Sequence, residues 1–122
     1  SQASVGSGIG GLAGGVASGK TVGNCYVRLS ELSSQAGDTP AAGWLAGVKT
    51  GAGFSACHYM SGNTATGCAP NDTSAGIISF TDFIGLCTSL NAEAENHSGW
   101  ALWKEVTDTG GTVEQVTLDL YR

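Results

Sequence analysis

The chain has few charged residues, and basic residues are the scarcest. Five Lys and Arg stand against ten Asp and Glu in 122 residues, so the net charge is −5 and the charged fraction is 12%. Proteins that bind nucleic acids need basic residues to displace counterions from phosphates, and anionic membrane surfaces attract the same residues. The composition therefore argues against nucleic acids and anionic membranes as partners.

Long apolar runs are also lacking. No segment approaches the ~20 apolar residues that a membrane-spanning helix requires, so we expect no membrane span in this chain. Apolar residues still make up 41% of the sequence, which is enough to build a core and argues against general disorder. The length of 122 residues is that of one ordinary domain.

Motifs for metal binding and catalysis are missing as well. Zinc sites usually place ligands two to four residues apart, and no two cysteines have that spacing. The sequence around Ser55 lacks the second glycine of a nucleophile elbow. The two histidines, His58 and His97, are interpreted as structural or solvated residues. We therefore predict no metal, no cofactor and no catalytic residue, and favour a non-enzymatic protein over a small secreted hydrolase.

Four cysteines are the most informative residues that are present. An even number of cysteines in a short chain is typical of disulfide bonds made in an oxidising compartment. This predicts a secreted or surface protein stapled by two disulfides. Chain entropy does not decide between pairing Cys25 with Cys87 and Cys57 with Cys68, and the alternative of pairing Cys25 with Cys57 and Cys68 with Cys87. The apolar faces of the predicted elements favour Cys25 with Cys87, and Cys57 with Cys68.

Residues 1–20 form a glycine-rich segment with no charge before Lys20. Its apolar residues recur at spacings of four and three, as in one helical stripe, and its glycines recur every four residues, which permits close backbone contact. Glycine disfavours helices in water, so a flexible leader is the alternative. We expect an N-terminal arm that packs on a neighbouring subunit through Val5, Ile9, Leu12, Val16, Gly6, Gly10 and Gly14.

Residues 21–122 are predicted to form a single disulfide-bonded α+β domain. A capping signal at Ser79 and Asp82 precedes an amphipathic pattern, so a helix is expected over about residues 80–95. Strand patterns on both sides of the turn at residues 108–111 predict a C-terminal β-hairpin. Together with earlier short strands, these elements suggest an antiparallel sheet with one main helix packed on it.

Aromatic residues and glycosylation sequences are the remaining candidates for interaction sites. Trp44, Trp100 and Trp103 offer flat surfaces for sugars or for another protein if they are exposed. Asn71 and Asn96 each begin an Asn-x-Ser/Thr glycosylation acceptor sequence.

These features lead to one main hypothesis and one rival. The main hypothesis is an extracellular structural subunit, such as a filament, surface-layer or virion component, whose arm packs on copies of itself or on another structural subunit. The rival is a secreted monomeric module that binds carbohydrate or a host protein through exposed aromatic residues.

Overall fold

A computed structural model describes residues 8–34 and 41–120 of the chain. The chain forms two compact units, residues 1–79 and residues 80–122, and each is described by itself. We call them unit 1 and unit 2. The division predicted from the sequence, an arm of residues 1–20 and a domain of residues 21–122, stays a prediction.

Unit 1 is built from short strands that follow one another around successive coils. The first coil, residues 8–34, contains β1 (Gly8–Gly10), β2 (Ala13–Gly15), β3 (Thr21–Val27) and β4 (Glu31–Ser33). The second coil, residues 41–67, contains β5 (Ala41–Gly43), β6 (Ala46–Val48), β7 (Gly53–Met60) and β8 (Thr64–Thr66). A shorter third segment contains β9 (Ala69–Pro70) and β10 (Ile77–Phe80).

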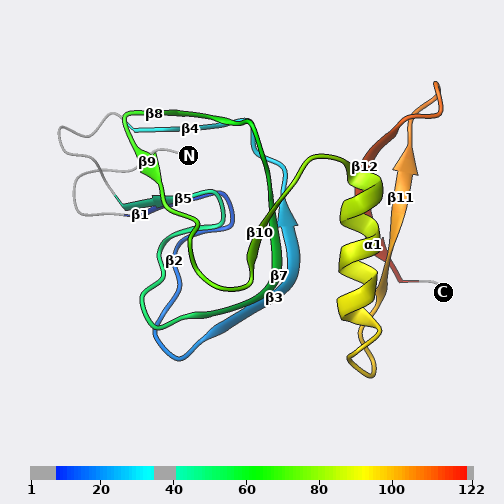
Figure 1. The fold of residues 1–122 in the computed structure, drawn as a ribbon, viewed down its shortest axis with the longest axis horizontal. Helices are drawn as coiled ribbons and strands as arrows, with labels where there is room; N and C mark the ends of the chain where they lie inside the picture. The colour runs from blue at the N-terminus through cyan, green and yellow to red at the C-terminus, as the bar shows by residue number, and fades with distance from the viewer. Residues whose placement is uncertain (1–7, 35–40, 121–122) are drawn as a thin grey trace. The chain divides into compact units, whose positions relative to one another are not determined.

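Each strand of the first coil pairs in parallel with the strand of the same rank in the second coil. β1 pairs with β5, β2 with β6, β3 with β7 and β4 with β8 (Figure 1). The third segment adds β9 beside β5 and β10 beside β7. Paired residues lie 32 or 33 positions apart, as for Cys25 with Cys57 and Ala13 with Ala46. Stacked coils of parallel strands make unit 1 a short β-solenoid.

Glycine is required where each coil folds back on itself. A Cβ atom on Gly10 would lie 1.9 Å from the carbonyl oxygen of Ala13, and one on Gly43 would lie 2.1 Å from that of Ala46. The obstacle is backbone in both cases, so no side-chain movement could relieve it. These glycines allow β1 to approach β2, and β5 to approach β6.

A second repeated feature is a residue in the left-handed backbone region. Asn24 has φ +49° and Ala56 has φ +51°. They precede Cys25 and Cys57, and the register of β3 and β7 passes over both. Each coil therefore bends at the same place, with Asn tolerating this conformation better than Ala does.

The core of unit 1 lies inside the coils. Its buried residues come from both complete coils, and partly buried residues such as Val22 and Phe54 pack against them. The buried set comprises Ile9, Val27, Leu32, Ala42, Trp44, Leu45 and Cys57.

Unit 2 consists of α1 (Phe83–Ala94) and an antiparallel hairpin of β11 (Leu102–Thr107) and β12 (Val113–Asp119). The Asp82 side chain caps α1 by accepting a hydrogen bond from the Gly85 N–H at 2.7 Å. Asn91 joins α1 to β11, because its side chain bonds both the N–H and the carbonyl of Trp103. The buried residues are Phe80, Leu86, Cys87, Leu90, Ala94 and Val116.

Several predictions about the fold are wrong. The fold is mostly β, with small parallel sheets, and not an α+β domain on an antiparallel sheet. Period-2 and period-3.6 patterns do not show whether a strand's partner lies one coil away, and this is why the sheet was predicted wrongly.

The single helix and the C-terminal hairpin are confirmed, although α1 begins three residues later than predicted and Asp82, not Ser79, is its N-cap. The predicted disulfides are wrong, because no two sulfur atoms of the described residues lie at bonding distance. Cys87 lies in unit 2 and donates to the Trp103 carbonyl, whereas Cys25 lies opposite Cys57 in unit 1.

Candidate functional site: the first-coil edge and the stacked cysteines

The outer edge of the first coil is the most distinctive surface of unit 1. Among the described residues, each of its four strands pairs on one side only, with the second coil. Natural proteins usually protect such edges with charged residues or proline. Here the four strands contain one charged residue, Glu31, and no proline.

Leu12 and Leu45 show what this edge exposes. They occupy the same place in the two coils, within the repeated sequence Leu-Ala-Gly, and the Leu12 N–H donates to the Leu45 carbonyl at 2.9 Å. Leu45 is 0% exposed, whereas Leu12 is 47% exposed. Equivalent leucines thus differ because the first coil lies beside Leu45, whereas no described coil lies beside Leu12 on its outer side.

The other arm residues are distributed differently. Ile9 is buried in the core, Val16 is half-buried, and Gly10 and Gly14 lie in β1 and β2. Val5 and Gly6 lie outside the described residues. Between residues 8 and 15, the predicted glycine-rich arm therefore forms the first two strands of the solenoid.

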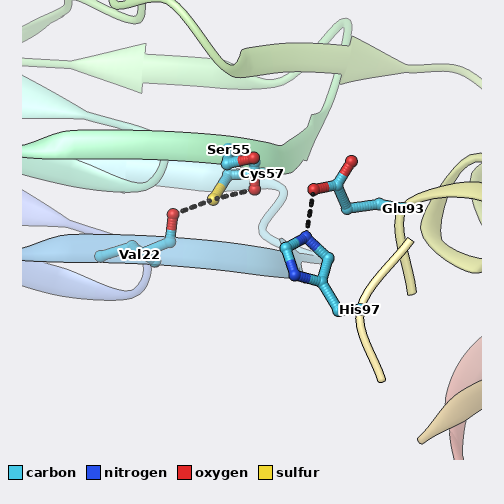
Figure 2. A network of polar contacts seen from close by, with 5 residues as sticks. All are labelled: Val22, Ser55, Cys57, Glu93 and His97. Carbon is cyan, nitrogen blue, oxygen red and sulfur yellow. Dashed lines mark hydrogen bonds and ion pairs between the residues drawn. The ribbon is translucent and has the colours of Figure 1, made fainter. Parts of the chain in front are cut away.

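A pair of cysteines is stacked between the two coils. Cys25 and Cys57 are directly opposed in the β3–β7 ladder, and their Sγ atoms lie 3.6 Å apart. Cys57 is 0% exposed and Cys25 is half-buried. Figure 2 shows the Cys57 thiol with the carbonyls to which it donates, those of Val22 at 3.2 Å and Ser55 at 3.5 Å.

The pKa values of the two thiols are shifted in opposite directions. The Cys25 thiol donates to the Cys57 sulfur, and this hydrogen bond lowers the pKa of Cys57 to about 7, against the opposing effect of burial. The same hydrogen bond, together with burial, raises the pKa of Cys25. Cys57 is therefore the more acidic thiol of the pair, and the thiolate is the reactive form of cysteine.

The two histidines occupy different environments. His58 is buried in β7, burial lowers its pKa, and its Nε2 atom has no hydrogen-bond partner among the described residues. His97 is exposed at the end of α1, where its ring nitrogen lies 3.0 Å from the Glu93 carboxylate (Figure 2). No described acid, hydroxyl or thiol is hydrogen-bonded to His58, so it has no catalytic partner there.

The three tryptophans also differ. Trp44 is buried in the core of unit 1, and Trp103 is half-buried in β11. Trp100 is 43% exposed, and one face of its ring stacks on His97 with ring centres 3.7 Å apart. Trp100 is therefore the tryptophan whose surface is most available to a ligand.

An open groove of about 480 Å³ lies between the second coil and the third segment. Its walls carry small and hydroxyl-bearing residues, and Lys49 is the one titratable side chain among them, donating to the Asn71 carbonyl. The groove therefore lacks an acid–base pair. Both glycosylation candidates, Asn71 and Asn96, are exposed.

The described residues contain no cluster of three or more His, Cys, Asp and Glu able to hold a metal ion. Over the same residues, no helix has the length and apolar character to cross a membrane. Comparisons with protein-family models, curated proteins and solved structures found no match to this chain.

Sequence reasoning missed the repeat that builds the site. Leu-Ala-Gly occurs at residues 12–14 and 45–47, and a cysteine follows at residues 25 and 57. A common offset of 32 or 33 residues is the signature of a stacked repeat. Aligning the sequence with itself could have placed Leu12 beside Leu45 and Cys25 beside Cys57.

Proposed function

We propose that this protein is a structural subunit whose copies associate through the first-coil edge. The observation that carries this proposal is the exposure of Leu12 at a position where its counterpart Leu45 is buried. A second copy that covers this edge would bury Leu12 as the first coil buries Leu45. Burying an exposed leucine contributes on the order of 1–2 kcal/mol.

The backbone of the edge supports the same partner. The Gly53 N–H donates to the Lys20 carbonyl, and Thr21 faces Gly53 in the register. In a parallel ladder the bonded residues alternate along a strand, so Thr21 directs its N–H away from the second coil. Another strand could accept this hydrogen bond, as in β-augmentation.

Charge favours self-association over a strongly charged partner. The four edge strands carry only Glu31, so two copies can approach there with little local repulsion. The net charge of −5 repels copies at long range, and salt screens that repulsion. We therefore expect association to strengthen as salt concentration rises.

Light scattering coupled to size-exclusion chromatography tests the proposal. Wild type should elute as species larger than one chain, and Leu12→Lys and Thr21→Pro should each shift it toward the monomer. Leu118→Lys and Thr109→Pro are matched controls in unit 2, since Leu118 is 42% exposed and Thr109 lies in the exposed turn after β11. A wild-type monomer at high concentration and high salt would contradict the proposal.

A monomer would favour the rival function, a secreted module that binds carbohydrate or a host protein. Its support is Trp100, whose exposed ring is held by the stack with His97. Location outside the cell or on a virion surface stays a prediction. The cysteines no longer support it, because the predicted disulfides are absent from the described residues.

A further inference from the structure

The stacked cysteines are a feature that the proposed function does not use. They differ from Cys68 and Cys87, whose sulfur atoms contact backbone carbonyls of Leu32 and Trp103. Only Cys25 and Cys57 bring two sulfur atoms together, 3.6 Å apart, among the described residues. Two sulfurs at this separation can bind one central atom together.

The separation sets the angle at which that atom is held. For bonds to sulfur of about 2.3 Å, the length of a zinc–thiolate bond, two sulfurs 3.6 Å apart subtend roughly 100° at the central atom. Trivalent arsenic forms pyramidal compounds with bond angles near this value. Ions that prefer two ligands in a straight line would require the sulfurs to separate.

We propose that Cys25 and Cys57 form a chelating dithiol site for trivalent arsenicals. The register holds the two side chains opposite each other before any ligand arrives, so little ordering is required on binding. Entry is from the side of Cys25, which is half-buried, whereas Cys57 is fully covered. Val22, whose carbonyl accepts a hydrogen bond from Cys57, is one of the partly buried hydrophobic residues packed on the core that contains Cys57.

The reaction exchanges oxygen for sulfur without oxidation or reduction. An arsenical of formula R–As=O reacts with the two thiols to form R–As(S–)₂, in which two As–S bonds replace the As=O bond. The two thiol protons leave with the oxygen as one water molecule. Cys25, the accessible sulfur, makes the first As–S bond, and Cys57, whose pKa is lowered, closes the chelate as the more acidic thiol.

Mass spectrometry with phenylarsine oxide tests the site. The folded protein, kept reduced by a phosphine, is incubated with the probe and an excess of 2-mercaptoethanol, which removes arsenic from single thiols. Wild type should retain one phenylarsenic group per chain. Cys68→Ser and Cys87→Ser, the matched controls, should retain it too, and 2,3-dimercaptopropanol should release it from all three.

Cys25→Ser and Cys57→Ser should each retain none. Since Cys57 is fully buried, its variant could fail to fold, and Cys25→Ser, checked by circular dichroism, then decides. Retention by folded Cys25→Ser, loss in Cys68→Ser or Cys87→Ser, or no retained group in wild type would each overturn the proposal. None of these results depends on oligomeric state, so the test is separate from that of the proposed function.

Discussion

The two units differ in how far apart in the sequence their paired residues lie. In unit 1, the strands of one coil pair with strands 32 or 33 residues further on, as Cys25 does with Cys57. In unit 2, β11 and β12 are joined by a short turn, and α1 contacts β11 through Asn91 and Trp103, 12 residues apart. The fold of unit 1 thus depends on pairing between residues of different coils, whereas the fold of unit 2 depends on contacts within a short segment.

Glycine also has different roles in the two units. In unit 1, Gly10 and Gly43 are required because backbone lies where their Cβ atoms would be. In unit 2, a Cβ atom on Gly110 would contact only the Asp108 carboxylate, at 3.4 Å. A high glycine content can therefore specify a tight coil, and it is not by itself a sign of flexibility.

Gly43→Ala should give the largest effect and should separate the two units. The new methyl group would lie 2.1 Å from the Ala46 carbonyl oxygen, so we expect unit 1 to lose about 3 kcal/mol or more. Hydrogen exchange should show lost protection in residues 8–34 and 41–79 and retained protection in residues 83–119. Gly110→Ala is the matched control, and equal effects of the two substitutions would contradict this account.

Asp82→Ala should give an intermediate effect confined to unit 2. It removes the side chain that accepts the Gly85 N–H, and loss of such a cap costs about 1 kcal/mol. Urea unfolding should measure the loss, with exchange increasing first at the start of α1. Thr81→Ala, at the neighbouring exposed position, should change stability by less than ~0.5 kcal/mol. A cap effect that spreads to unit 1 would show that the units unfold together.

Ala56→Gly should give the smallest effect, and its sign should be favourable. Ala56 has φ +51°, a conformation that costs roughly 1–2 kcal/mol for residues other than glycine. The added freedom of glycine in the unfolded chain offsets part of this gain, so we expect about 0.5 kcal/mol of stabilisation in thermal unfolding. Asn24→Gly, the equivalent change in the first coil, should gain less, and a larger gain there would contradict the explanation.

The same contrast explains how far the sequence could predict the structure. Ser79 and Asp82 signalled the helix of unit 2 close to its start, and the glycines after Asp108 signalled the hairpin. The strands of unit 1 carry no such local signal of their partners. β1 and β2 are three residues each and consist of glycine, alanine and Ile9, so neither period nor propensity identifies them as strands.

The candidate site residues of unit 1 also depend on partners one coil away. Leu12 and the cysteines were singled out from the sequence, but the residues that lie beside them in the next coil were not identified. The exposure of Leu12 depends on Leu45, and the acidity of Cys57 depends on Cys25. Both relations cross from one coil to the next, and only the repeat offset could have revealed them.

The offset between coils also sets an order of events while the chain is being made. Residues nearest the N-terminus leave the ribosome first, yet the strands of residues 8–34 pair with strands of residues 41–66. The first coil must therefore wait without its strand partners until the second has emerged. During that interval the unpaired strands of the first coil are most exposed to pairing with another nascent chain on the same messenger RNA.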